Sequence, residues 1–290
     1  MATSHIEALR GMLREEKGVL LPGVPNALGA RIAADLGFRV VYLTGAGLTN
    51  MYLGLPDLGF MDLSQVAEHV MAIRSVVDVP LIADADTGFG NAINVTHTVR
   101  VLEQAGASGI QIEDQDSPKR CGHFAGKELI PLPEMLGKIK AAVDTRRQGM
   151  VVIARTDACA VEGFEAAIER ASRFVEVGAD VTFVEAPETL DDLRAVPRRL
   201  KSPQMLNLVL GGKTPIIDQA AAKEMGFSLV LYANAALQGA VHGMLTTLSA
   251  LKTNGILSEV AVASFAERQR LVDKPAYDAM ETRYAAKSFE

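Results

Sequence analysis

The segment 119–123 has the sequence Lys-Arg-Cys-Gly-His and places a thiol among cationic side chains. Cationic neighbours lower the pKa of a cysteine and favour its thiolate, so Cys121 is a candidate nucleophile or acid-base group beside Lys119 and His123. An isolated cysteine is more often a small buried residue, but charged residues and glycine form a poor core environment. The pattern therefore predicts an enzyme in which Cys121 takes part in the chemistry.

Acidic residues follow two neighbouring predicted strands and could bind a metal ion. Asp84 and Asp86 are two residues apart, so in a continuing strand they point to the same side and repel each other unless a cation holds them. Glu113 ends the next predicted strand, and Asp57 could join the group. Oxygen ligands suit Mg2+, or Mn2+ in its place, and argue against zinc, because no His-rich or Cys-rich ligand set is present. We expect a magnesium site here.

Glycines after Thr44 offer backbone N–H groups to an anion. Gly45 and Ala46 could bind a carboxylate or a phosphonate, although a simple turn explains these glycines equally well. The segment lacks the Gly-x-Gly-x-x-Gly spacing of a dinucleotide site, so a nicotinamide cofactor is not implied.

Arg155 ends an otherwise apolar predicted strand and could hold a second carboxylate through two hydrogen bonds. Ion pairs with Glu185 or Glu113 are alternative roles, and both are compatible with substrate binding. Asp114 and Asp157 also follow strands, and each is open to a simpler interpretation as a helix cap or a support.

The elements that position these residues alternate between short β-branched runs and longer segments of helical period. One apolar face at helical spacing contains Phe164, Ala167, Ile168 and Ala171. Four similar three-residue motifs join the end of a predicted helix to the start of a predicted strand. Each contains a glycine that we expect in the left-handed conformation, at positions 37, 106, 178 and 226. The predicted strands cover residues 19–21, 40–43, 80–83, 109–113, 151–155, 181–185, 205–208 and 228–231.

Eight such units without a linker predict a closed (β/α)8 TIM barrel of the α/β class, with an open doubly wound sheet as the alternative. We expect one barrel domain over residues 1–290 and a C-terminal helical extension over roughly 257–290, because more helix follows the eighth strand than one unit needs. In such a barrel the active site lies at the carboxyl ends of the strands, where the residues above collect.

The segment 115–130 is long for a connection in a compact barrel, and it contains the thiol. Such a loop could act as a lid that delivers Cys121 and excludes water, or it could be an inert surface loop.

Composition argues against several classes of function. The net charge is −6 with dispersed Lys and Arg residues, so no nucleic-acid partner is expected. The apolar stretch 229–251 is interrupted by Asn, Gln, His and Thr residues, so no membrane partner is expected either. Two cysteines and a start without a basic and apolar signal region predict a cytoplasmic location.

Taken together, these motifs resemble the isocitrate lyase and phosphoenolpyruvate mutase superfamily, and most closely its 2-methylisocitrate lyase and 2,3-dimethylmalate lyase members. The resemblance covers most of the chain. In this superfamily the loop at 119–123 marks the carbon-carbon lyases, whereas the phosphorus-carbon enzymes carry a different loop. The matching motifs are Tyr42-Leu-Thr-Gly-Ala-Gly, Gly54-Leu-Pro-Asp-Leu-Gly, Asp84-Ala-Asp-Thr-Gly-Phe-Gly, Ile112-Glu-Asp-Gln, Lys119-Arg-Cys-Gly-His, Ala154-Arg-Thr-Asp-Ala, Phe183-Val-Glu-Ala-Pro and Asn207.

The resemblance implies a Mg2+-dependent retro-aldol cleavage of a 2-hydroxy di- or tricarboxylate to a 2-oxo acid, such as pyruvate, and a second carboxylate. By this likeness Asp84 would bind the metal directly, while Asp57, Asp86 and Glu113 would hold metal-bound waters. The residues expected to bind the substrate are Tyr42, Thr44, Gly45, Ala46, Asp84, Gly122, Arg155, Glu185 and Asn207.

The same likeness assigns the proton donor. Cys121 would protonate the carbanion-like product, with His123 and Lys119 tuning it. The base for the 2-hydroxyl stays open between Arg155, a metal-bound water and Tyr42. The expected catalytic residues are Cys121, His123, Lys119, Arg155 and Glu113.

Two local differences bear on the substrate. The anion loop at 44–47 is Thr-Gly-Ala-Gly, and Asn207 is followed by Leu-Val-Leu-Gly-Gly-Lys-Thr-Pro. Both resemble the branch of 2,3-dimethylmalate lyase and petal death protein, which takes 2-alkylmalates. An oxaloacetate hydrolase that forms oxalate and acetate is the alternative function, and a phosphonopyruvate-type mutase or hydrolase is less well matched because of Cys121. The resemblance also implies a homotetramer, built as a dimer of helix-swapped dimers.

Overall fold

The computed structural model describes residues 4–120, 122, 126–259 and 262–285, and every structural statement below refers to these residues. The described chain forms two compact units, Met1–Leu237 and Gln238–Glu290. The predicted C-terminal extension lies within the second unit. The candidate functional residues all belong to the first unit or to the segment 121–125, of which Gly122 alone is described.

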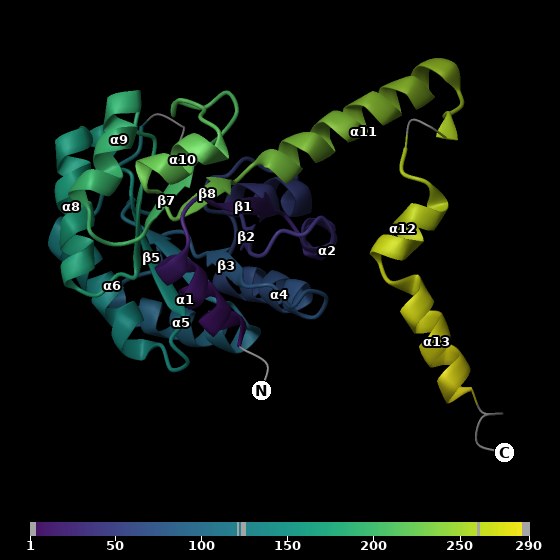
Figure 1. The fold of residues 1–290 in the computed structure, drawn as a ribbon, viewed down its shortest axis with the longest axis horizontal. Helices are drawn as coiled ribbons and strands as arrows, with labels where there is room; N and C mark the ends of the chain where they lie inside the picture. Colours follow the sequence, from purple (N-terminus) through teal and green to yellow (C-terminus); the bar gives the residue numbers. More distant parts are fainter. Residues whose placement is uncertain (1–3, 121, 123–125, 260–261, 286–290) are drawn as a thin grey trace. The chain divides into compact units, whose positions relative to one another are not determined.

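The described part of the first unit contains eight parallel strands that close into a barrel in chain order, with β8 paired to β1 (Figure 1). This arrangement confirms the predicted (β/α)8 barrel. The predicted strands agree with the observed ones to within three residues at each end. The strands are β1 Val19–Val24, β2 Val41–Leu43, β3 Leu81–Asp84, β4 Gly109–Glu113, β5 Val151–Thr156, β6 Val181–Val184, β7 Gln204–Asn207 and β8 Leu229–Tyr232.

Alternation along each strand divides the core between the inside and the outside of the barrel, because successive side chains point to opposite faces. In β5, for example, Val151 and Ile153 belong to the apolar cluster inside the barrel, whereas Val152 and Ala154 pack outward against the helices. The barrel interior is filled with apolar side chains, so the open space for chemistry lies at its ends.

The longer helices that connect successive strands cover the outside of the barrel with one apolar face each (Figure 1). In α5, Val95, Val99 and Leu102 are fully buried at helical spacing and belong to the outer cluster. The elements are α1 His5–Glu15, α2 Ala27–Asp35, α3 Gly45–Leu48, the π-helical turn η1 Thr49–Leu53, α4 Leu63–Arg74, α5 Ala92–Ala105, α6 Leu132–Thr145, α7 Ala158–Val161, α8 Phe164–Glu176, α9 Leu190–Arg199 and α10 Gln219–Met225.

The four glycine motifs predicted from the sequence occur where helices end. Gly106 and Gly226 are the residues that directly follow α5 and α10, with φ of 101° and 104°. Gly37 and Gly178 have φ of 86° and 104°, so the left-handed conformation predicted at all four positions is confirmed. These turns bring the chain from each helix end back to the start of the next strand.

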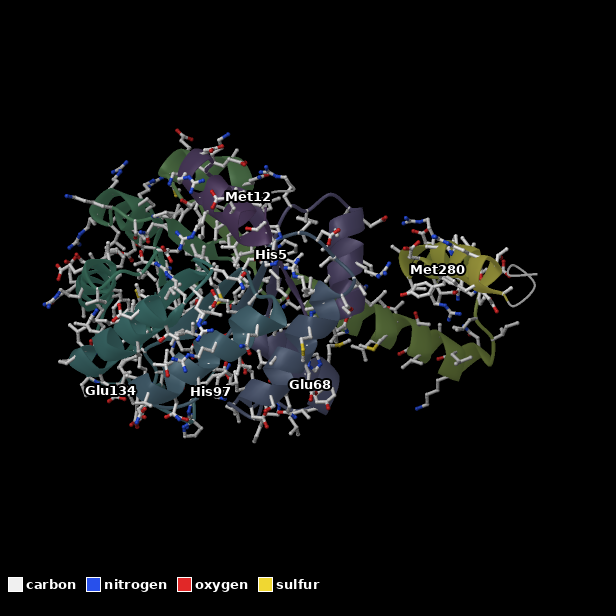
Figure 2. The ribbon with its side chains drawn as sticks, turned by 90° about the horizontal axis from the view of Figure 1, so that it is seen from below. His5, Met12, Glu68, His97, Glu134 and Met280 are labelled. Atoms are coloured by element: carbon white, nitrogen blue, oxygen red, sulfur yellow. The ribbon has the colours of Figure 1, made fainter. Side chains whose placement is uncertain are left out.

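Helix α1 packs on the end of the barrel where the strands begin. Its Leu9 and Leu13 belong to the same buried cluster as Leu21 and Ile153 of the barrel interior. Figure 2 labels His5 and Met12 on this helix, and His5 Nδ1 lies 3.1 Å from Ser108 Oγ, just before β4. This helix therefore occupies the amino end of the barrel and leaves the carboxyl ends of the strands for a site.

Three helices contribute to the second unit: α11 Ala235–Asn254, which begins in the first unit, α12 Phe265–Leu271 and α13 Lys274–Tyr284. The described residues of α12 and α13 include none that is buried in the single chain. Met280, labelled in Figure 2, is 44% exposed. No helix in the described ranges is long and apolar enough to cross a membrane.

Candidate active site

A pocket lies at the carboxyl ends of the strands and gathers most of the predicted site residues. Asp86, Gly45 and Glu185 were also predicted and lie behind the lining residues, in contact with them. The residues that line the pocket are Tyr42, Thr44, Ala46, Asp57, Asp84, Glu113, Lys119, Arg120, Gly122, Arg155, Phe183, Asn207, Val209, Leu231, Ala233 and Asn234.

Lys119 joins two of the predicted acidic residues on one side of this pocket. Its Nζ lies 2.6 Å from Asp57 Oδ1 and 2.9 Å from Asp86 Oδ1, and all three side chains are largely buried. Burial lowers the pKa of Lys119, but the Asp86 and Asp57 carboxylates outweigh it and raise the pKa well above its ordinary value. Lys119 is therefore a permanent positive charge at the site.

The expected position of Asp84 and Asp86 on one side of a continuing strand is not observed. Strand β3 ends at Asp84, and Asp86 has a left-handed φ of 46°. The turn is closed by the Asp86 N–H, which donates to Asp84 Oδ1 at 3.1 Å. The two carboxylates remain neighbours through this turn, and Ala85 between them is fully buried in the outer core.

Gly45 stands against both carboxylates. Its N–H donates to Asp84 Oδ2 at 3.2 Å, and a Cβ at this position would lie 3.0 Å from the same oxygen. The Thr44 N–H donates to the Val24 carbonyl, while Thr44 and Ala46 both line the pocket. The absence of a side chain at Gly45 thus lets the start of the short helix α3 lie close to Asp84.

The acidic residues of the pocket are carboxyl groups whose charged forms the neighbouring protein groups do not fully stabilise. Burial raises the pKa of Asp86 to about 6, with Lys119 opposing and Asp84 adding to the rise. Burial also raises the pKa of Glu113 well above its ordinary value. Glu113 Oε1 is buried and accepts no hydrogen bond from the described residues. Such a carboxylate oxygen calls for a donor or a cation in the pocket.

The oxygen-rich side chains at this part of the pocket fit a hard cation such as Mg2+. Among the described side chains, no three His, Cys, Asp or Glu residues come together as a closed metal-ligand group. Mg2+ retains several waters and commonly takes one or two carboxylates directly, so it does not need a closed group. Asp84 is half-buried at the pocket, and Glu113 has a buried oxygen that accepts from no described residue, so both offer oxygens that suit such a cation.

Arg155 also lines the pocket, next to Glu113. Its Nε donates to Asp157 Oδ2 at 2.9 Å and lies 3.4 Å from Glu113 Oε2, and its Nη1 lies 3.9 Å from Glu185 Oε2. Both ion pairs considered for Arg155 from the sequence are present, and Asp157 adds a third. The guanidinium also stacks on Phe183, with 5.2 Å from its carbon to the ring centroid. It is therefore held in one plane beside the pocket.

Asn207 and Glu185 complete this part of the pocket. The Asn207 Nδ2 lies 3.3 and 3.4 Å from the two oxygens of Glu185, as a donor to that carboxylate. Its Oδ1 is buried and accepts no hydrogen bond from the described residues. Asn207 therefore has an acceptor to offer a hydroxyl or water in the pocket.

Tyr42 lies deeper, on β2, and donates its hydroxyl proton to Gln111 Oε1 at 2.6 Å. Burial, followed by the nearby Asp84 carboxylate, raises the pKa of Tyr42 well above its ordinary value. The phenol therefore stays protonated, and it acts here as a hydrogen-bond donor rather than as a base.

Cys121 and His123 lie outside the described residues. Gly122 between them is buried and lines the pocket. A Cβ on Gly122 would lie 2.4 Å from Arg155 Nη2 and 2.7 Å from Glu185 Oε1. The described ends of the segment are tied together as an antiparallel bridge between Gln115 and Leu129.

Several residues at the site were missed or left open by the sequence. Asp114 and Asp157 are supports rather than caps: Asp114 accepts from Thr156 Oγ1 at 2.7 Å, and Asp157 holds Arg155 without capping α7. Asn234 lines the pocket just after β8, where its position at a strand end was the available signal. Lys127, whose Nζ donates to Asp157 Oδ1 at 2.7 Å, gave no signal, because a lysine in a polar loop is normally solvated.

Comparison with known proteins gives the family. The model of the phosphoenolpyruvate phosphomutase family matches residues 9–252. A 2,3-dimethylmalate lyase from Eubacterium barkeri is 38% identical over 280 residues, which cover 96% of this chain and 97% of that protein. A 2-methylisocitrate lyase from Aeropyrum pernix is 45% identical over 252 residues, covering 87% of this chain and 81% of that protein.

Solved structures of related proteins support the same family assignment. A 2,3-dimethylmalate lyase superimposes with a TM-score of 0.92 at 33% identity, covering 100% of this chain and 98% of that one. An oxaloacetate acetylhydrolase bound to 3,3-difluorooxalacetate has a TM-score of 0.90 at 36% identity, with 98% and 97% covered. A phosphonopyruvate hydrolase in complex with oxalate and Mg2+ has a TM-score of 0.87 at 33% identity, with 97% and 99% covered.

These relatives confirm the resemblance that the motifs suggested, including the relation to carbon-carbon lyases. The match extends over the barrel and all the strand ends that form the pocket. The chain therefore belongs to the phosphoenolpyruvate mutase and isocitrate lyase superfamily.

Proposed function

We propose that the chain is a Mg2+-dependent lyase that cleaves the C2–C3 bond of a 2-alkylmalate, with 2,3-dimethylmalate as the preferred type of substrate. The observation that carries the proposal is the lining of the pocket, which combines the carboxylates of Asp84 and Glu113 with the guanidinium of Arg155. A dianionic 2-hydroxy acid has a group for each: oxygens for a cation beside the carboxylates and a carboxylate for the arginine.

Magnesium, when bound beside Asp84, would stabilise negative charge on the 2-oxygen of the substrate. Asp57, Asp86 and Glu113 would orient its waters, and Mn2+ would serve in its place. Arg155 would bind a substrate carboxylate, while Thr44, Gly45 and Ala46 would line the end of the pocket that receives the 2-oxo acid. Glu185 and Asn207 would hold Arg155 and a substrate oxygen in place.

The reaction is a retro-aldol cleavage. A base takes the proton of the 2-hydroxyl, the C2–O bond becomes a carbonyl, and the C2–C3 electron pair moves to C3. Cys121 then supplies a proton to C3, with Lys119 and His123 adjusting its acidity. For 2,3-dimethylmalate the products are pyruvate and propionate. Burial raises the pKa of Tyr42, and the surrounding carboxylates outweigh burial and raise the pKa of Arg155, so both stay protonated and a water is the remaining choice for the base.

The oxaloacetate hydrolase alternative has specific support in the close superposition with an oxaloacetate acetylhydrolase. That reaction needs a positioned water that adds to C2, in addition to the proton that C3 takes up when the C2–C3 bond breaks. The two relatives by sequence that are described above are lyases, and this favours cleavage of a carbon-carbon bond without water.

A substrate panel tests the proposal. The purified chain is assayed with Mg2+ on 2,3-dimethylmalate, 2-methylmalate, 2-methylisocitrate, oxaloacetate and phosphonopyruvate, with and without EDTA. We expect pyruvate from the alkylmalates, no turnover after chelation, and restoration by Mg2+ or Mn2+. Oxalate release from oxaloacetate as the dominant reaction would replace the lyase proposal by the hydrolase one.

The proposal extends to assembly and location. Apolar residues spaced three or four apart form one face of α11, and Val241, Met244, Leu245 and Leu248 on it are between 43% and 64% exposed in the single chain. We therefore propose a homotetramer, formed as a dimer of dimers that exchange their C-terminal helices.

We also propose a cytoplasmic location, in keeping with two cysteines in the sequence.

A further inference from the structure

Lys127 lies on the returning arm of the segment that follows β4, and its ammonium group is buried. Its side chain is 1% exposed. Backbone hydrogen bonds fix this arm: the Asp116 N–H donates to the Glu128 carbonyl, and the Ile130 N–H donates to the Asp114 carbonyl. A loop lysine normally keeps its charge in water, because burying an ammonium is unfavourable unless protein groups replace that water. The partners of Lys127 therefore account for its position.

Two oxygen atoms accept hydrogen bonds from Lys127 Nζ. One is Asp157 Oδ1 at 2.7 Å, and the other is the backbone carbonyl of Gly122. Asp157 is itself fully buried, directly after β5. The contact is a charge-assisted hydrogen bond without competing water, which makes it strong and specific in geometry.

Asp157 connects Lys127 to Arg155. Its carboxylate accepts from Arg155 Nε at 2.9 Å and from Arg155 Nη2 at 3.0 Å. The oxygen that binds Nη2 is the same Oδ1 that accepts from Lys127. Because the guanidinium is a rigid fork, this paired contact fixes its plane and leaves its other edge towards Glu185.

The charges of the cluster show what the ammonium adds. With every group ionised, Arg155 and Lys127 face the carboxylates of Asp157, Glu113 and Glu185, which leaves a formal charge of −1. Without Lys127 the same cluster would carry −2. The extra negative charge would draw Arg155 towards its own carboxylates and repel an anionic substrate.

Gly122 receives the second contact and lies directly against Arg155. The short distance from its hypothetical Cβ to Arg155 Nη2, 2.4 Å, places its backbone on the guanidinium. Gly122 also lines the pocket. One ammonium thus holds the backbone beside Arg155 and, through Asp157, the guanidinium itself.

We propose that Lys127 is a positioning residue, whose buried ammonium sets the orientation of Arg155 through Asp157 and the place of Gly122 next to it. This inference rests on the proposed function, in which Arg155 is the group that binds a substrate carboxylate. Lys127 touches no reacting atom in this scheme, so its effect is transmitted through Arg155.

The test measures binding of oxalate in the presence of Mg2+ by calorimetry, together with the melting temperature, on the full chain. Lys127→Met removes the charge, and Lys127→Arg keeps it. Arg74→Met is the control, because Arg74 donates to the backbone carbonyls of Gly106 and Val77 at the opposite end of the barrel. Oxalate is the probe because its carboxylates should bind Arg155 and it is not a substrate, so its affinity reports on Arg155 without any turnover.

We expect Lys127→Met to weaken oxalate binding by about tenfold or more and Lys127→Arg by less than about threefold. Arg74→Met should leave oxalate affinity unchanged even where it lowers the melting temperature. Lys127→Met with wild-type oxalate affinity and a lower melting temperature alone would overturn the inference, because it would show a purely structural lysine.

A double-mutant cycle gives a second measurement. Lys127 and Asp157 act through the same guanidinium, so Lys127→Met combined with Asp157→Asn should weaken oxalate binding no more than the worse single variant. If the fold-losses in oxalate affinity of the two single variants multiply in the double variant, Lys127 and Asp157 do not act through the same guanidinium. Arg155→Met with unchanged oxalate affinity would also overturn the inference. If the wild type binds oxalate with Mg2+ but cleaves none of the panel substrates, the proposed function fails instead.

Discussion

Two buried cations with different partners divide the pocket at the scale of single residues. Lys119 is shared between Asp57 and Asp86, whereas Arg155 is shared among Asp157, Glu113 and Glu185. Each cation has more carboxylates around it than it can neutralise. A dianionic substrate therefore needs additional positive charge to enter, and the proposed Mg2+ would supply it.

Replacement of the proposed proton donor separates chemistry from binding. Cys121→Ser should lower lyase turnover by about 10^2-fold or more, because a serine hydroxyl is a much weaker acid than a thiol. Pyruvate release measures turnover, and calorimetry with oxalate and Mg2+ should give wild-type affinity. Cys159→Ser is the matched control and should retain turnover. A Cys121→Ser enzyme as fast as the wild type would remove Cys121 from the mechanism.

The second thiol should be chemically inert. Burial, reinforced by Asp192 and other nearby carboxylates, raises the pKa of Cys159 to about 12. At pH 8 its thiolate fraction is then about one in 10^4. The thiolate becomes a substantial fraction only when the pH approaches that pKa. Iodoacetamide at pH 8 should label Cys121 and spare Cys159, as read by peptide mass spectrometry. Rapid labelling at Cys159 would contradict its burial.

Gly122 provides a steric test of the pocket. Gly122→Ala adds a Cβ that would lie 2.4 Å from Arg155 Nη2, so Gly122 or Arg155 must move. We expect oxalate affinity to fall by about tenfold with little change in melting temperature. Gly137→Ala in α6 is the control, since the nearest atom to its new Cβ lies 4.0 Å away. Equal oxalate affinity in both variants would show that Gly122 is not packed on Arg155 in solution.

Sequence identified the residues that face the pocket better than those that support them. Asp84, Glu113 and Arg155 stood out because polar groups at strand ends are unusual in apolar runs. Asp157 was ambiguous, since an aspartate after a strand is often a cap. Lys127 could not be found, because its burial depends on how a sixteen-residue segment, 115–130, returns to the barrel. Such a contact is tertiary and has no local signature.

At the scale of elements, the strands were predictable because each is a short apolar run bounded by polar residues. The turn at Asp86 was not, since its left-handed conformation at a non-glycine residue is a local departure from the strand. Helix α1 was not predicted either, because the barrel was inferred from the strands and the segments that connect them. Its position at the amino end depends on packing against side chains inside the barrel.

Helix α1 should contribute stability without contributing to the site. Leu9 is fully buried among the apolar residues inside the barrel, so Leu9→Ala should lower the free energy of unfolding by about 2–4 kcal/mol. The KM for 2,3-dimethylmalate should not change, because the pocket lies at the other end of the strands. Urea denaturation and steady-state kinetics measure the two effects. A raised KM with unchanged stability would place α1 in contact with the site.

For the whole molecule, the two compact units differ in how far they can bury apolar surface alone. The first unit encloses a complete barrel with its covering helices. In the second unit, Ile256 and Phe265 are each 71% exposed in the single chain. Exposure of this kind over several helices is typical of surfaces that associate with another copy.

Assembly can be tested through mass. Light scattering on the eluting protein should give about four times the 30.9 kDa of one chain. Leu245→Glu combined with Leu248→Glu places charges on the exposed face of α11 and should yield smaller species. Gln238→Glu, on the same helix, is a single-charge control. A monomeric wild type would refute the proposed tetramer.

The direct pairing of β8 with β1 also determines when the barrel can form during synthesis. Val19 pairs with Leu229, so the first edge of the sheet finds its neighbour only after more than two hundred residues have followed it. A nascent chain that stops before Leu229 leaves the backbone groups of β1 open to another strand. Ribosomal pausing before Leu229 is translated would therefore expose this edge to a neighbouring nascent chain.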